Sequence, residues 1–140
     1  MSPIVLLDAA PLVAFFSKRD ANHRWAKEQI NRQTASMLTC EAVLSEACFL
    51  TERILGNSDV VMEFVQKGAV KIGFNLKDEI GDIRTLMIRY ANVPMSLADA
   101  CLVRMSELYP NSTVLTADSD FNIYRRHTRQ IIPVMMPAAK

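Results

Sequence analysis

The sequence lacks any apolar run near the eighteen residues that a membrane-spanning helix requires. Its N-terminus also lacks the basic segment, the long apolar stretch and the cleavage site of a secretory signal. From these two absences we expect a cytoplasmic protein that makes no membrane contact.

Cysteine is scarce, and its spacing argues against two common uses of the residue. The chain has three cysteines, Cys40, Cys48 and Cys101, and no two of them form a Cys-x-x-Cys pair. All three lie within apolar patterns. The sequence therefore favours reduced core thiols over a disulfide framework or a zinc site.

Net charge is almost absent as well, since 16 Lys and Arg residues stand against 15 Asp and Glu residues. The total favours no class of partner, but the distribution is more informative. Arg125, Arg126, His127 and Arg129 form a basic cluster near the C-terminus. Its arginines are candidate RNA-binding residues, because such a cluster can contact phosphates. The alternative is an ordinary solvated surface.

The chain has 140 residues, of which 50% are hydrophobic and 22% charged. These values are typical of one globular domain with a sizeable core. No repeat, low-complexity tract or linker divides it. We expect a single domain at 1–136 and a frayed tail at 137–140.

Apolar periodicity predicts strands and helices in alternation, which is typical of an α/β fold with a parallel sheet. The expected strands are 4–7, 36–39, 70–74, 112–116 and 131–134, and the expected helices are 11–16, 23–33, 40–55, 59–67, 77–90 and 96–109.

Acidic residues follow two of these strands. The apolar run at 4–7 ends at Asp8, and the strand at 112–116 leads through Thr116 to Asp118 and Asp120. Ligands of open parallel sheets bind at the carboxyl ends of the strands. Asp8 and Asp118 should therefore lie near each other. Asp8 could instead cap the next helix, although Ala10 then precedes Pro11 at its start.

Two further acids lie on helices. At 100° per residue, Glu46 projects between Phe49 and Leu50 inside an apolar arc, where a lone carboxylate is costly. A salt bridge to Arg53 is the structural alternative, while Glu41 on the outer face should be solvated.

Asp99 stands in the first turn of the most apolar helix, three residues after Ser96. This spacing also fits a capping box, which does not exclude a second role at the sheet edge. Four acids converging without basic neighbours would repel one another, and a divalent cation resolves the repulsion. An all-oxygen ligand set suits Mg²⁺ or Mn²⁺.

Four segments, IVLLD, TCEAVLSEACFL, SLADACLV and VLTADSDF, resemble in order and spacing the PIN-domain ribonucleases, in particular the toxins of VapBC-type toxin-antitoxin pairs. The resemblance implies a three-layer α/β/α fold with a central parallel sheet of about four or five strands. It also implies a metal-dependent endoribonuclease with Mg²⁺ or Mn²⁺ as cofactor, single-stranded RNA as substrate, an antitoxin partner and a homodimer. The acidic catalytic and metal-binding residues of the family correspond to Asp8, Glu46, Asp99 and Asp118, with Thr116 in support and Asp120 as a further ligand.

The chain departs from that family where a Ser or Thr commonly follows the first aspartate, since Ala9 and Ala10 stand there. The departure keeps open a catalytically weakened RNA-binding or protein-binding module on the same fold. An aspartyl-phosphate enzyme or receiver domain also places acids at strand ends. However, Ala10 stands where the enzyme motif needs a second aspartate, and the late strands lack the lysine that a receiver requires.

Overall fold

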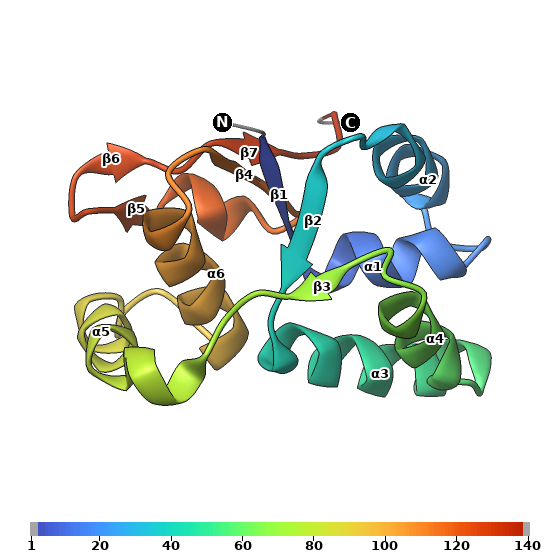
Figure 1. Cartoon of the computed structure of the whole chain (residues 1–140), viewed down its shortest axis with the longest axis horizontal. Helices are drawn as coiled ribbons and strands as arrows, with labels where there is room; N and C mark the ends of the chain where they lie inside the picture. Colours follow the sequence, from blue (N-terminus) through green and yellow to red (C-terminus); the bar gives the residue numbers. More distant parts are fainter. Residues whose placement is uncertain (1–2, 139–140) are drawn as a thin grey trace.

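The computed structural model describes residues 3–138. Its centre is a five-stranded sheet in which every neighbouring pair of strands is parallel (Figure 1). The strand order is β3 (Lys71–Ile72), β2 (Ser36–Thr39), β1 (Ile4–Leu7), β4 (Ser112–Leu115) and β7 (Val134–Met135).

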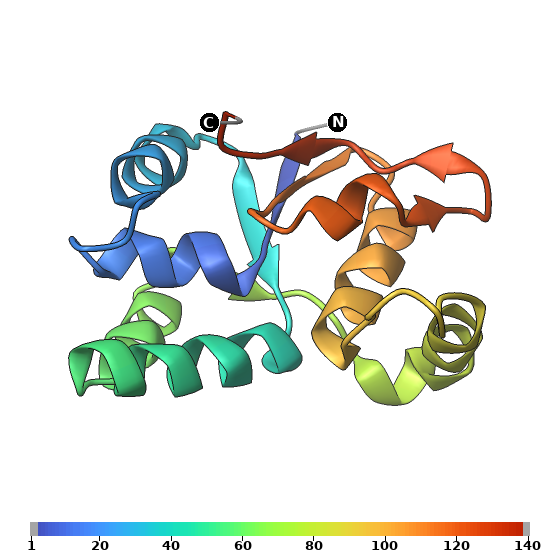
Figure 2. The same cartoon turned by 180° about the vertical axis from the view of Figure 1, so that it is seen from behind.

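Among residues 3–138, six α-helices flank this sheet in two groups. Helices α1 to α4 lie on one side of the strands and α5 and α6 on the other, as Figures 1 and 2 both show. Their bounds are α1 Ala9–Phe16, α2 His23–Arg32, α3 Glu41–Leu55, α4 Asp59–Gln66, α5 Leu76–Arg89 and α6 Leu97–Leu108. This arrangement confirms the expected three-layer α/β/α fold with a central parallel sheet of five strands.

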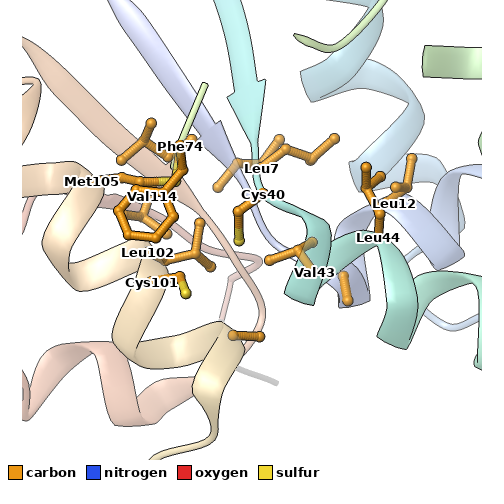
Figure 3. Close-up of a cluster of buried hydrophobic side chains, with 14 of the residues drawn as sticks. Leu7, Leu12, Cys40, Val43, Leu44, Phe74, Cys101, Leu102, Met105 and Val114 are labelled. Atoms are coloured by element: carbon orange, nitrogen blue, oxygen red, sulfur yellow. The ribbon is translucent and has the colours of Figure 1, made fainter. Parts of the chain in front are cut away.

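Part of the core lies where β1 and β4 run side by side under α6. Leu6, Leu7, Val114 and Leu115 are fully buried, because a strand in the middle of a covered parallel sheet has no solvent face. Figure 3 shows this cluster continuing onto α6 through Leu102 and its neighbours. The apolar run before Asp8 is thus buried on both faces, as its lack of alternation indicates.

The strand expected at 131–134 is wrong as a single element. It is two strands separated by Ile132 and Pro133, and the Pro133 ring leaves no N–H for a sheet hydrogen bond. β6 (Gln130–Ile131) pairs antiparallel with β5 (Arg125–Arg126) in a separate hairpin. The hairpin turns at His127 and Thr128, which both have positive φ. β7 then joins the main sheet beside β4.

Other bounds differ slightly from the expected ones. The first helix begins at Ala9, two residues before Pro11, and β3 covers only two of the five residues expected at 70–74. Of the expected tail, residues 139 and 140 lie outside the described part of the chain, as do residues 1 and 2 at the other end. Within residues 3–138 no helix is long and apolar enough to cross a membrane.

Candidate active site

Two adjacent strands deliver the first acidic residues to one edge of the sheet. β1 and β4 are parallel neighbours with Leu7 opposite Leu115, so the chain leaves both strands at the same level. The backbone N–H of Asp8 donates to the carbonyl of Leu115 over 3.0 Å and extends this pairing by one residue. Asp8 and Thr116 consequently emerge side by side at the carboxyl edge.

Asp8 is both a helix cap and a buried member of this edge. One carboxylate oxygen accepts from the N–H of Ala9 (2.7 Å), and the other accepts from the Thr116 hydroxyl (2.7 Å). Only 6% of Asp8 is exposed. Since the helix begins at Ala9, the capping interpretation of Asp8 describes a real contact. That contact occupies one oxygen and leaves the carboxyl group facing other acids.

Burial raises the pKa of Asp8 from 3.8 to about 6. The hydrogen bonds from Thr116 and Ala9 lower the pKa, whereas the negative charges of Asp99 and Glu46 raise it further. The ionised carboxylate is therefore held in an unfavourable setting, next to like charges and with little water.

Thr116 links Asp8 to the acidic loop that follows β4. Its hydroxyl donates to Asp8 and accepts from the N–H of Asp118 over 3.0 Å. Asp118 in turn accepts from the N–H of Asp120 over 2.9 Å and caps the 3-10 helix Ser119–Asn122. These bonds hold the half-buried Asp118 in place, while Asp120 contributes its backbone to the turn.

Asp99 forms the capping box expected from its spacing to Ser96. Its N–H donates to the Ser96 hydroxyl (3.0 Å), and its carboxylate accepts from the Ser96 N–H (3.2 Å). Asp99 is nevertheless 9% exposed and has other acids close by. Burial is the main cause that raises its pKa, and the charge of Asp118 adds to the effect. Capping and membership of the acidic edge coexist here.

Tyr124 is a site residue that the sequence did not indicate. Its buried hydroxyl lies 2.8 Å from the carbonyl oxygen of Pro94 and 3.3 Å from a carboxylate oxygen of Asp99. The ring packs edge to face against Tyr90 and Phe121, which fixes its position. Tyr124 follows an irregular segment with no helical or strand period, so no sequence pattern links it to Asp99.

The expected burial of Glu46 is wrong. The buried positions of α3 are Val43, Leu44, Ala47 and Thr51, and Glu46 is exposed at the side of that face. The apolar arc misled the prediction because it includes Phe49, which is itself 59% exposed.

Glu46 also does not form the salt bridge to Arg53 that was the structural alternative. Arg53 lies over the Phe49 ring instead, 5.5 Å from its centroid, and no Glu46–Arg53 ion pair exists within residues 3–138. Partial burial, followed by the charges of Asp99 and Asp118, raises the pKa of Glu46. Glu46 therefore belongs electrostatically to the acidic group. As expected, Glu41 is exposed.

The four acids form one electrostatic group that contains no positive charge. Within residues 3–138, no ion pair involves Asp8, Glu46, Asp99 or Asp118. As the side chains stand, no three acidic, histidine or cysteine side chains in that range are close enough to hold one metal ion. The group is thus gathered at one edge, yet its carboxylates are not closed around a common centre.

The family model of the PIN domain matches residues 5–126, which include all four acids. The chain belongs to the PIN domain family. The resemblance to VapC-type members is confirmed by two proteins of Mycobacterium tuberculosis.

The first relative is ribonuclease VapC26, which is 23% identical over 132 residues and matches over 93% of each chain. The second is a crystal structure of VapC20, described as a sarcin-ricin loop cleaving toxin. It superposes with a TM-score of 0.79 at 18% identity and covers 92% of this chain and 99% of its own. At that identity the VapC20 likeness shows the fold alone.

In this PIN domain Arg126 of the basic cluster lies toward the C-terminal end of α6, away from Asp99, whereas Arg125 directly follows Tyr124, whose hydroxyl contacts Asp99. The Arg125 guanidinium donates to the carbonyls of Asn122, Ile123 and Tyr124, and that of Arg126 donates to those of Ser106 and Pro110. Asp99 and Ser106 stand seven residues apart on α6, or about 10 Å along a helix. Both arginines thus have structural partners, and a role in RNA binding stays a prediction for them and for Arg129.

Proposed function

We propose that this protein is a Mg²⁺- or Mn²⁺-dependent endoribonuclease that cleaves single-stranded RNA. The observation that carries the proposal is the group formed by Asp8, Glu46, Asp99 and Asp118 at the carboxyl edge of the sheet. Three of these acids have raised pKa values, and within residues 3–138 no ion pair with a basic residue relieves them. A cation taken from solution would remove this repulsion.

The donor set fits a hard divalent cation. All four side chains offer oxygen atoms alone, which is the preference of Mg²⁺ and Mn²⁺. Asp8, Asp99, Asp118 and Glu46 would hold the ion, with Asp120 as a further candidate ligand. A bound ion would neutralise charge on the scissile phosphate and supply an activated water for in-line attack.

The chain's own hydrogen bonds would orient these ligands. Thr116 fixes one oxygen of Asp8 and the backbone of Asp118 at the same time. The Ser96 N–H and the Tyr124 hydroxyl both contact the same carboxylate oxygen of Asp99. Such partners commonly set the orientation of ligating carboxylates. Glu46, exposed on α3, has the most freedom to move toward a ligand.

RNA as substrate is supported by two relatives, since VapC26 is a ribonuclease and VapC20 cleaves the sarcin-ricin loop. The same relatives support a toxin with an antitoxin partner. A homodimer is a further expectation of the family resemblance. An RNA substrate would place the protein in the cytoplasm.

Cleavage of a labelled single-stranded RNA by the purified protein tests the proposal. We expect cleavage with Mg²⁺ or Mn²⁺ and none after chelation. Asp99→Asn should reduce the rate at least about 100-fold, because asparagine keeps the capping contacts but loses the charge of a ligand. Glu41→Gln, on the exposed outer face of α3, is the control and should cut RNA at the normal rate. If the Asp99→Asn variant cleaves RNA at the wild-type rate, the only role of Asp99 is to cap α6.

A catalytically weakened binding module is the second candidate. Ala9 offers the site a backbone N–H instead of a hydroxyl, and the carboxylates are not closed around one centre. This function predicts RNA or protein binding without cleavage at any metal concentration. RNA cleavage that depends on Asp99 would exclude it.

A further inference from the structure

Two of the three thiols meet at the boundary between the two helix groups. Cys40 is the residue between β2 and α3, and Cys101 lies in the second turn of α6. Each is 1% exposed. Figure 3 shows the two side chains on either side of the boundary between the start of α3 and α6. Residues 61 positions apart in the sequence thus bring their sulfur atoms together.

The surroundings of Cys40 lower the pKa of its thiol. The adjacent Cys101 thiol is the largest influence that lowers the pKa of Cys40, and the backbone N–H groups of Val43 and Ala42 at the start of α3 lower it further. Burial acts in the opposite direction. Helix N-termini and thiol partners have this effect on reactive cysteines in general. Cys48, the third thiol, has no such partner, and burial raises its pKa.

A cavity of about 520 Å³ connects the thiol pair with the surface. Cys40 and Cys101 both line it, and the exposed residues Glu41, Asn75 and Lys77 also belong to its wall. Because so little of either sulfur is exposed, a molecule of two heavy atoms can reach the thiols more easily than a bulky reagent can.

We propose that Cys40 and Cys101 are an oxidative modification site that a small hydroperoxide converts into a disulfide. The Cys40 thiol releases its proton, its sulfur attacks one peroxide oxygen, and the O–O bond breaks. Cys40 sulfenic acid and hydroxide form, and the hydroxide takes up the released proton to give the first water. The Cys101 sulfur then attacks the Cys40 sulfur, the S–O bond breaks, and hydroxide leaves. The Cys101 proton completes a water molecule. In total two thiols are oxidised and one hydrogen peroxide is reduced to two waters.

The disulfide would join the two helices that carry acidic residues of the site. Cys101 lies two residues after Asp99 on α6, and Cys40 directly precedes α3, which carries Glu46. Since the carboxylates are not closed around one centre, metal binding requires these groups to approach one another. A crosslink would restrain α3 relative to α6 and weaken metal binding. This consequence rests on the proposed function, whereas the disulfide itself does not.

Intact mass before and after hydrogen peroxide treatment tests the site. We expect the folded protein to lose the mass of two hydrogens, and a non-reducing digest to contain the Cys40 peptide joined to the Cys101 peptide. Cys48→Ser should behave identically. Cys101→Ser should stop at the Cys40 sulfenic acid, which the intact mass shows as a gain of one oxygen atom. Oxidation first at Cys48, or no loss of mass, would overturn the proposal. Both outcomes are measured on the wild-type protein, so neither depends on whether a variant folds.

Calorimetric titration with Mn²⁺ tests the coupling to the acidic edge. The oxidised protein should bind Mn²⁺ at least about fivefold more weakly than the reduced protein, and dithiothreitol should restore the affinity. Equal affinity of both forms would overturn the coupling. Failure of the reduced protein to bind Mn²⁺ would contradict the proposed metal site. The intact mass would still test the disulfide, because that measurement does not depend on metal binding.

Discussion

Helix α6 connects two acidic clusters that differ in one respect. Near its C-terminal end, Arg104 binds Glu79 (2.6 Å), Glu107 (3.0 Å) and Asp82 (3.4 Å). At its N-terminal end, Asp99 shares the sheet edge with acids that have no basic partner within residues 3–138. The first cluster contains its own cation. The second has raised carboxyl pKa values, and under the proposed function its cation would come from solution.

Removing the cation of the paired cluster should give the largest change in stability. Arg104→Met keeps the length of the side chain but leaves three carboxylates without their partner. We expect the free energy of unfolding to fall by about 2 kcal/mol, as measured by denaturant titration. Lys67→Met removes an exposed pair with Glu63 and should change it by less than about 0.5 kcal/mol. Equal effects would mean that Arg104 acts as an ordinary surface charge.

Removing one fixed partner of the unpaired cluster should weaken metal binding. Tyr124→Phe deletes the hydroxyl next to Asp99, so the carboxylate loses part of its orientation. We expect the Mn²⁺ dissociation constant to rise about tenfold, measured by calorimetry. Tyr109→Phe deletes a hydroxyl that donates to the carbonyl of Gly73 away from Asp99, and it should leave the constant unchanged. An unchanged constant in Tyr124→Phe would limit Tyr124 to a structural role.

Neutralising Asp8 should raise the stability of the protein, whereas neutralising Arg104 should lower it. Asp8→Asn removes a buried charge from among like charges, although Thr116 loses its acceptor. We expect the metal-free protein to gain about 1 kcal/mol of stability at neutral pH. Asp20→Asn, which changes a loop aspartate that accepts from the Asn22 N–H, should bring no gain. A loss of stability in Asp8→Asn would show that its hydrogen bonds outweigh the repulsion.

The gain should depend on pH in a defined direction. The folded pKa of Asp8, about 6, lies above the unfolded value of 3.8, so the folded state binds more protons between these values. The penalty of ionised Asp8 is therefore absent below pH 3.8 and fully present above pH 6. The stability difference between Asp8→Asn and the wild type should grow as the pH rises through this window. A constant difference would contradict the raised pKa.

The smallest expected effect concerns the hairpin. Arg129 is exposed, whereas Arg125 and Arg126 donate to backbone carbonyls, so Arg129→Ala tests RNA contact with the least structural disturbance. If Arg129 contacts a phosphate, the slope of log affinity against log salt should fall by about 0.7. Arg24→Ala on α2, which lies across the sheet from the hairpin in Figure 1, is the matched control. An unchanged slope would direct the search to Arg84 and Arg89 on α5.

Sequence reasoning succeeded where local pattern and topology agree. The apolar runs before Asp8 and before Thr116 predict neighbouring strands, and strand pairing alone brings their ends together. It failed for Glu46, because a helical arc cannot tell a buried apolar residue from an exposed one such as Phe49. It also missed Tyr124, whose contact with Asp99 depends on how an irregular loop packs. Long-range packing of this kind leaves no periodic signal in the sequence.

Binding of Mn²⁺ to the metal-free protein, measured by calorimetry at pH 7.5, tests the central claim most directly. The wild type should bind Mn²⁺, Asp99→Asn should lose that binding, and Glu107→Gln in the paired cluster should keep it. At pH 6, binding should also release protons, because Asp8 is then about half protonated. Equal Mn²⁺ binding by Asp99→Asn and the wild type, or no binding by the wild type, would contradict the account.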